Sequence, residues 1–194
     1  MKVRCSKPFL LCVVLLFLLD HRGFYLLVFA GILIHESGHL LAMTWMRCNI
    51  EQLELRMSGL NLKYGDSHLS YGKDAFIALA GPLANLLTAA ILILYSHIDP
   101  AAKWDLMIGV QVLLAGFNLL PALPMDGGRV LQAFISWRWG MERGEYVLQA
   151  TTAVVSAILL GVGIYACKAP WHNPTLLITA CLLLVSLLRR DESR

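Results

Sequence analysis

Along the chain, six apolar segments alternate with short polar stretches. A helix that crosses the hydrocarbon core of a bilayer needs about 20 mostly apolar residues, and a shorter segment can extend into its polar flanks or thin the bilayer. The expected spans are residues 8–19, 23–46, 75–96, 104–120, 145–167 and 174–188. The pattern therefore predicts an all-α polytopic membrane protein with about six transmembrane helices.

The connection between the second and third expected helices follows a different pattern. Apolar and polar residues alternate in residues 53–64, LELRMSGLNLKY, which is typical of β-strands. Ser58-Gly59 separates the two runs and predicts a two-residue turn. We expect a membrane-associated β-hairpin in which Glu54 lies opposite Lys63, a favourable cross-strand pair. Its role stays open between a plain surface hairpin and an exposed edge to which an extended peptide can add.

The composition agrees with a membrane protein. Hydrophobic residues make up 58% of the chain and charged residues 15%, against about 25% charged residues in soluble domains. The mean hydropathy is +0.65. We expect a single transmembrane domain over residues 1–194, without a CBS or PDZ domain. The basic N-terminus and its apolar run could also be a signal peptide, but Asp20-His21-Arg22 stands where a small-x-small cleavage site would be expected.

The distribution of positive charge predicts the orientation of the spans. From the N-terminus through the five connections to the C-terminus, Lys and Arg number three, one, four, one, three, one and three. Cytoplasmic connections of membrane proteins carry the excess of Lys and Arg. Both termini and the second and fourth connections are therefore expected in the cytoplasm. Removing one span would break the alternation, so the charges support a count of six.

Three ionisable residues interrupt the second apolar segment, where His35, Glu36 and His39 form the pattern His-Glu-x-x-His. On a helix, positions i and i+4 share one face, so both imidazoles can bind one zinc ion. Glu36 projects to the side and can take a proton from zinc-bound water, whose pKa the metal lowers from 15.7 to roughly 7. A chance match is disfavoured, because polar groups within a membrane need partners or a wet cavity. The remaining histidines are expected to be solvated surface residues: His21, His68, His97 and His172.

A catalytic zinc site needs a third protein ligand, and Asp126 is the strongest candidate. It lies in FNLLPALPMDGGRV, residues 117–130, just past the fourth expected span. The prolines disfavour regular helix there, and Gly127 and Gly128 allow the backbone to approach closely. We therefore expect an irregular loop that presents one carboxylate. The second and fourth spans both run toward the cytoplasm, so this loop and His39 can meet. Weaker candidates are the hairpin and loop glutamates Glu51, Glu54, Glu142 and Glu145.

Two amides at membrane depth are further candidates. Asn118 could donate a hydrogen bond to a developing oxyanion, or it could cap the end of the fourth helix, and the pattern leaves both roles open. Asn85 lies in LAGPLANLL, residues 79–87, and its role is undecided. In the same stretch, Gly81 and Pro82 indicate close packing or a kink.

Together these motifs resemble the site-2 protease family of intramembrane zinc metalloproteases. The resemblance rests on His-Glu-x-x-His in the second span, Gly-Pro-x-x-Asn at 81–85, and Asn-x-x-Pro-x-x-Pro-x-Asp-Gly-Gly at 118–128. It covers about residues 8–190. The compact six-span form with a hairpin is most similar to the stage IV sporulation protease branch of bacteria. The chain departs from that branch at the hairpin turn, which reads Met57-Ser58-Gly59-Leu60 instead of a Pro-Phe-Gly-Gly-like stretch.

The resemblance implies hydrolysis of a peptide bond in or near a transmembrane segment of another protein, such as a membrane-tethered transcription factor or its regulator. It implies one Zn2+ per chain, bound by His35, His39 and Asp126. Glu36 would act as the base, and Asn118 would stabilise the oxyanion. The hairpin would align an extended substrate. The substrate-binding candidates are Leu55, Met57, Leu60 and Asn85.

The same resemblance implies a location and a set of partners. We expect an integral protein of a bacterial cell membrane whose active site opens toward the cytoplasm. The expected partners are the lipid bilayer, a membrane protein substrate and a membrane regulatory partner, with no nucleic acid.

Three alternative functions stay open. The first is a membrane metalloprotease that shares His-Glu-x-x-His but takes its third ligand from a Glu on a later helix. Asp126→Asn would abolish zinc binding only if Asp126 is the third ligand. A metal transporter or sensor would use the same ligands without a base. An inactive protease-like scaffold would only bind membrane partners. The last two predict that Glu36→Gln leaves function intact.

Overall fold

The helices dominate the structure, a computed structural model that describes residues 2–5, 23–48, 50–56, 59–64, 70–99, 104–168 and 175–191. Three helices in this part of the chain are long and apolar enough to cross a membrane: α2 (Phe24–Trp45), α3 (Tyr71–Ile98) and α6 (Met141–Lys168). Two apolar helices are shorter, α4 (Asp105–Asn118) and α7 (Thr175–Asp191). The prediction of a mainly helical membrane protein is confirmed.

The expected spans correspond to the helices with one correction. The second to sixth spans match α2, α3, α4, α6 and α7, whereas residues 8–19 lie outside the described residues, so the count of six stays a prediction. The correction concerns the fourth connection, which contains a helix, α5 (Asp126–Trp139). The prolines of this connection predict irregular structure there, but Pro121 and Pro124 both lie before the helix begins. The helix then runs to Gly140, whose φ of 91° favours glycine.

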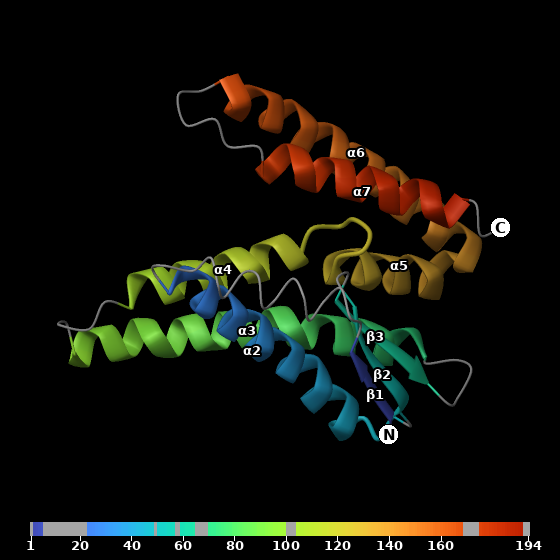
Figure 1. The fold of residues 1–194 in the computed structure, drawn as a ribbon. Coiled ribbons are helices and arrows are strands. Elements are labelled where there is room, and N and C mark those ends of the chain that lie inside the picture. Colours follow the sequence, from blue (N-terminus) through green and yellow to red (C-terminus); the bar gives the residue numbers. More distant parts are fainter. Residues whose placement is uncertain are drawn as a thin grey trace.

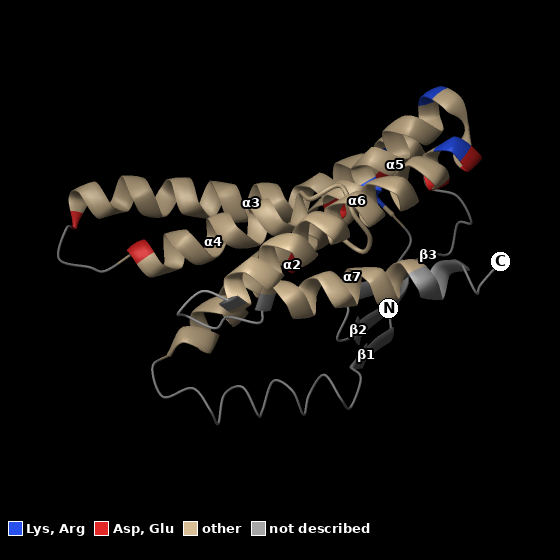
Figure 2. Ribbon diagram, turned by 90° about the horizontal axis from the view of Figure 1, so that it is seen from above, with Lys and Arg blue, Asp and Glu red and all other residues tan. Residues whose placement is uncertain are grey.

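The helices form two groups that α5 connects. Figure 1 shows α2, α3 and α4 side by side, and α6 and α7 as a separate antiparallel pair. Helix α5 packs against both α3 and α6. Charged residues gather at the helix ends, and the long middle parts carry few (Figure 2). Many large apolar side chains on α2, α3, α4 and α6 face outward. In an integral membrane protein such side chains face lipid.

Small residues allow α2 and α3 to approach closely. A Cβ atom on Gly38 of α2 would lie 2.5 Å from the carbonyl oxygen of Ala80 and 2.8 Å from the Cβ of Ala84, both on α3. Substitution at Gly38 would therefore push the helices apart. Small residues at helix contacts are a general means of packing in membranes, because van der Waals contact replaces the hydrophobic effect there.

Two strands in the connection between α2 and α3 form a three-stranded sheet with one strand at the N-terminus. Strands β2 (Ile50–Arg56) and β3 (Gly59–Tyr64) are antiparallel neighbours, as the alternation predicts. Strand β1 (Lys2–Cys5), which the sequence did not suggest, pairs in parallel with β2 and completes the order β1-β2-β3. The strands therefore bring the N-terminus beside the segment that follows α2 (Figure 1).

The predicted pairing of Glu54 with Lys63 is wrong. Glu54 lies opposite Asn61, and Lys63 lies opposite Gln52. The two residues between the strands are 57 and 58, not Ser58-Gly59, and they lie outside the described residues. Alternation cannot separate the two registers, because a shift of the pairing by two residues again places apolar positions opposite apolar ones.

Candidate metal centre

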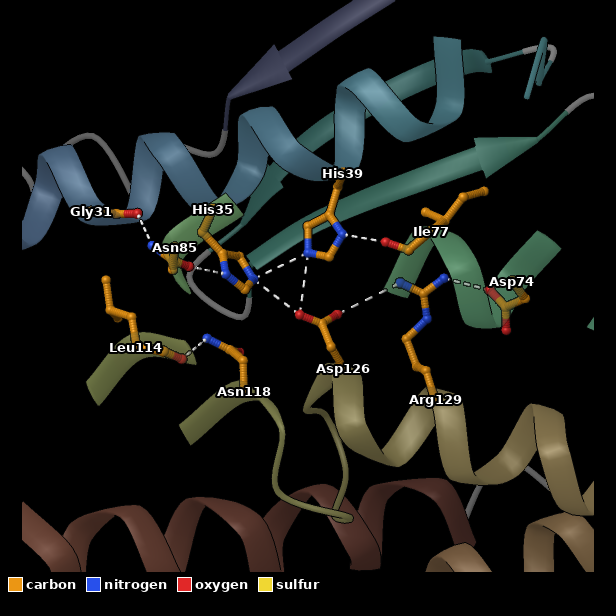
Figure 3. Close-up of polar contacts among 10 residues, drawn as sticks. All are labelled: Gly31, His35, His39, Asp74, Ile77, Asn85, Leu114, Asn118, Asp126 and Arg129. Carbon is orange, nitrogen blue, oxygen red and sulfur yellow. Dashed lines mark hydrogen bonds and ion pairs between the residues drawn. The ribbon is translucent and has the colours of Figure 1, made fainter. Parts of the chain in front are cut away.

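Two histidines from α2 and one aspartate from α5 converge at one point inside the helices. His35 Nε2 lies 3.1 Å from His39 Nε2, and Asp126 Oδ2 lies 3.0 Å from the first and 3.2 Å from the second. All three residues are buried. The histidines are four residues apart and therefore share a helical face, as the sequence predicts. Figure 3 shows them reaching toward Asp126 from the opposite side of the cluster.

The other ring nitrogen of each histidine is held by an acceptor. His39 Nδ1 donates to the backbone oxygen of Ile77 at 2.8 Å. His35 Nδ1 donates to Asn85 Oδ1 at 2.7 Å. Both acceptors belong to α3. Since Nδ1 carries the proton in each ring, a neutral ring presents the lone pair of its Nε2 to the common point.

This arrangement fits a zinc ion. Two imidazole lone pairs and a carboxylate oxygen repel one another unless a cation lies between them. The three ligand atoms are 3.0–3.2 Å apart, and tetrahedral ligands at about 2.0 Å from zinc would be about 3.3 Å apart. Nitrogen and carboxylate ligands are a donor set that zinc accepts, and His35, His39 and Asp126 would hold it.

Asp126 is presented by a helix end and not by an irregular loop. It is the first residue of α5, where the helix dipole favours a negative charge. The two glycines do allow close approach, since a Cβ atom on Gly128 would lie 2.5 Å from the backbone oxygen of Ala122.

The segment before Asp126 is tied to α6 and α7. The backbone N–H of Leu123 donates to Thr152 Oγ1 of α6 at 2.9 Å. Ser186 Oγ of α7 donates to the backbone oxygen of Leu123 at 3.4 Å. These contacts hold the turn between α4 and α5, and with it the position of Asp126.

Gly81 makes room for the histidines on α3. A Cβ atom at this position would lie 2.6 Å from His39 Cε1 and 2.8 Å from His35 Nε2. Both distances are shorter than ordinary contacts, so any larger residue would displace the imidazole rings. Close packing, which the Gly-Pro pair indicated, therefore takes place at the metal centre itself.

An ion pair lies beside the cluster. Arg129 of α5 binds Asp74 of α3 at 2.6 Å, and its other terminal nitrogen lies 4.0 Å from Asp126 Oδ1. Figure 3 shows this line of charges running from the cluster toward the start of α3. Neither Arg129 nor Asp74 was singled out in the sequence. In the sequence, Arg129 indicates only a positive charge in a connection expected in the cytoplasm, and nothing there predicts its ion pair.

The two catalytic candidates are near the ligands in sequence but differ in their contacts. Glu36 follows His35 on α2, and its Oε2 is buried without a hydrogen-bond partner among the described residues. A buried carboxyl oxygen left without a partner is costly and suggests a functional role. Asn118 ends α4 and donates from Nδ2 to the backbone oxygen of Leu114 at 2.9 Å, which is the helix-end contact that the sequence also allowed.

The substrate-binding candidates lie in different places. Leu55 and Leu60 are opposite each other on β2 and β3, and Met57 lies outside the described residues. Asn85 is fully buried behind His35, with both ends of its amide in hydrogen bonds. Its partner Gln111 on α4 was not singled out, although a lone amide in the apolar run LMIGVQVLLAG is a recognisable signal.

Comparison with known proteins points to one family. The model of peptidase family M50 matches residues 95–162, which include Asn118 and Asp126. A zinc metalloprotease of Methanocaldococcus jannaschii is 28% identical over 145 residues, 72% of this chain and 42% of the relative. A protein of Synechocystis that carries a provisional zinc metalloprotease name is 32% identical over 132 residues, 65% of this chain and 34% of the relative. The chain thus spans less than half the length of the curated relatives it matches.

The fold has a counterpart among solved structures. The chain aligns with a site-2 protease from Methanocaldococcus jannaschii with a TM-score of 0.70 and 22% sequence identity. The alignment covers 100% of this chain and 92% of the other. The two proteins share a fold.

Proposed function

We propose that the chain is a member of peptidase family M50, the site-2 protease family, and that it is an intramembrane zinc endopeptidase. The observation that carries the proposal is the convergence of His35, His39 and Asp126. The next residue on α2, Glu36, supplies a buried carboxyl oxygen without a partner in the described part of the chain. A zinc ligand set beside a carboxylate is the arrangement used to activate water for peptide hydrolysis.

In this mechanism, His35, His39 and Asp126 would hold a zinc ion. When bound, zinc supplies Lewis acidity that polarises the scissile carbonyl and makes water more acidic. Glu36 accepts a proton at Oε2 from the attacking water and passes it to the leaving amine. Asn118 donates a hydrogen bond to the oxygen on which negative charge develops, through the Nδ2 hydrogen that its contact with Leu114 does not use.

We further propose that the substrate is a segment of another membrane protein that lies extended at the β2–β3 pair. A helix hides its peptide groups in hydrogen bonds from residue i to residue i−4, so the segment has to unwind before it is cut. Extended backbone can then pair with a strand edge, as Leu55 and Leu60 already pair with each other across β2 and β3.

The proposed orientation places the chain termini and the site opening in the cytoplasm. Its support is the alternation of Lys and Arg along the chain. A further support is the parallel pairing of β1 with β2, which holds the N-terminus on the side where α2 ends and the sheet begins. Strands β1 and β2 can pair only if they lie on the same side of the membrane, so an even number of spans must separate them. The proposed path has two, the expected span at residues 8–19 and α2.

Co-expression with a panel of tagged single-span membrane proteins tests the proposed activity. The expected result is a shortened product of at least one of them in cells with the unaltered protein, and none in cells with Glu36→Gln at equal abundance. A metal transporter, a sensor or an inactive scaffold has no need for Glu36 as a base. Cleavage that persists with Glu36→Gln would exclude the proposed role of this residue.

A further inference from the structure

A chain of buried amides extends from the metal centre into α4. Asn85 of α3 accepts from His35 Nδ1 at 2.7 Å. The Nδ2 group of the same amide donates to the backbone oxygen of Gly31 at 3.0 Å and to Gln111 Oε1. Asn85 and Gln111 are both fully buried. Three helices, α2, α3 and α4, thus meet at one connected set of hydrogen bonds (Figure 3 shows its part around Asn85).

The partners determine which way the Asn85 amide points. A backbone oxygen and Gln111 Oε1 can only accept, so the NH2 group of Asn85 must face them. The oxygen Oδ1 is then left for His35, and it can only accept. His35 Nδ1 must therefore carry the proton, which keeps the lone pair of Nε2 for the metal. Through the Asn85 amide, the acceptor on Gln111 thus influences which nitrogen of His35 carries the proton.

Gln111 is itself held in the orientation that this requires. Its Nε2 group lies 3.8 Å from the sulfur of Met107, one turn earlier on α4, in a weak N–H···S contact. Turning the Gln111 amide over would place its NH2 group against the NH2 group of Asn85.

We propose that Gln111 is a positioning residue for the metal centre, acting through Asn85 on His35. It touches neither the metal ligand nor the reacting atoms. Outer partners that orient a histidine ligand typically change metal affinity by about 10–100-fold when they are lost. The inference rests on the proposed zinc site, and it gives Asn85 a role in place of substrate binding.

If these contacts only stabilise the packing of the helices, a different result is expected. Amides between membrane helices can simply hold the helices together. In that case, loss of Gln111 would lower the stability of the protein without a specific effect on zinc. Metal affinity, measured apart from activity, separates the two readings.

Zinc affinity of the purified full chain, measured by competition with a chelating dye, tests the proposal. Gln111→Met has nearly the volume of the original residue but no acceptor for Asn85. We expect it to weaken zinc binding about five- to tenfold, the effect of one lost hydrogen bond in the chain of amides. Gln111→Glu keeps an acceptor and is expected to stay within about threefold of the unaltered protein. Equal loss in Gln111→Met and Gln111→Glu would overturn the proposal, as would no loss in Gln111→Met.

A double-substitution cycle tests whether Gln111 acts through Asn85. Asn85→Ala alone is expected to weaken zinc binding about 10–100-fold. Adding Gln111→Met to Asn85→Ala should then change nothing further, because the intermediate is gone. A second loss of the same size in the double variant would show that Gln111 acts by another route and would overturn the inference.

Val110→Ala is the matched control, since it shortens a buried side chain at the position directly before Gln111 without removing a hydrogen bond. It should lower the thermal stability of the metal-free protein and leave zinc affinity unchanged. A loss of affinity in Val110→Ala as large as in Gln111→Met would count against the proposal. Failure of the zinc site itself is distinguishable, because His35→Ala would then bind zinc as well as the unaltered protein.

Discussion

At the scale of single residues, the proposed metal centre depends on which nitrogen of each imidazole carries a proton. The backbone oxygen of Ile77 and the side-chain oxygen of Asn85 accept from Nδ1 of His39 and His35. Both Nε2 atoms therefore face Asp126 with their lone pairs. The spacing of the two histidines already predicts a shared face, but not the acceptors behind them, because these lie on another helix, 38 and 50 residues away in the sequence.

Glu36→Gln separates chemistry from metal binding at this scale. The amide cannot accept the proton of the attacking water, so cleavage should fall by about 10²–10⁴-fold. Zinc content should be unchanged, since Glu36 is not a ligand. Unfolding temperature should stay equal or rise, because a buried carboxyl oxygen without a described partner is replaced by a neutral group. Metal analysis and thermal unfolding of the purified variant check both statements, and loss of zinc would contradict them.

Asp126→Asn tests the third ligand. The amide oxygen is a much weaker zinc ligand than the carboxylate, so the purified variant should contain far less than one zinc per chain. Asp74→Asn is the control: it makes the same chemical change at the partner of Arg129, whose nitrogen lies 2.6 Å away. The control should keep its zinc. Equal zinc content in the two variants would exclude Asp126 as a ligand.

At the scale of helices and strands, the backbone around the ligands is shaped by small residues. Helix α3 approaches the histidines at Gly81 and approaches α2 at Gly38, while α5 begins against the turn that precedes it. The sequence predicted the apolar helices because a membrane span needs a long apolar run. It missed α5, because the Pro and Gly residues of this connection favour irregular structure, whereas an Asp in the first turn favours a helix. It also missed β1, because four residues are too few to reveal the alternation of apolar and polar positions that predicts a strand.

Gly81→Ala tests the close approach of α3. The new methyl group would lie 2.6 Å from His39 Cε1 and 2.8 Å from His35 Nε2, so both rings must move. We expect at least a tenfold loss of zinc affinity, in line with the sensitivity of metal centres to their surroundings. Gly72→Ala, on the same helix with nothing within 4 Å of the added methyl, is the control and should bind zinc normally. The dye-competition assay measures both, and equal affinity would exclude a role for this contact.

At the scale of the whole molecule, the path of the chain decides whether the ligands can meet. Asp126 and His39 are far apart in the sequence, and they come together because α2 and α4 run in the same direction and both pack against α3 (Figure 1). Charge alternation and hydropathy predicted this juxtaposition from the sequence. The pairing register of β2 and β3 was not predictable in the same way, because two registers satisfy the same alternation.

The proposed orientation predicts which helix ends are exposed outside the cell. His97 lies near the end of α3, and Glu142 lies at the start of α6. In intact cells producing a cysteine-free variant, a membrane-impermeant maleimide should label His97→Cys and not Glu142→Cys. Both side chains are exposed, so both should react after the cells are opened. The reverse pattern would invert the orientation, and labelling of both in intact cells would contradict the proposed path.

Hydrolysis by the purified protein tests the central claim most directly. The zinc-loaded chain is reconstituted in lipid vesicles with a substrate found by co-expression, in water enriched in ¹⁸O, and the products are analysed by mass spectrometry. The account predicts a new C-terminus within or next to the membrane segment that carries ¹⁸O, formed by the unaltered protein and not by Glu36→Gln or Asp126→Asn. The same product from Glu36→Gln, or no ¹⁸O at the new C-terminus, would contradict it.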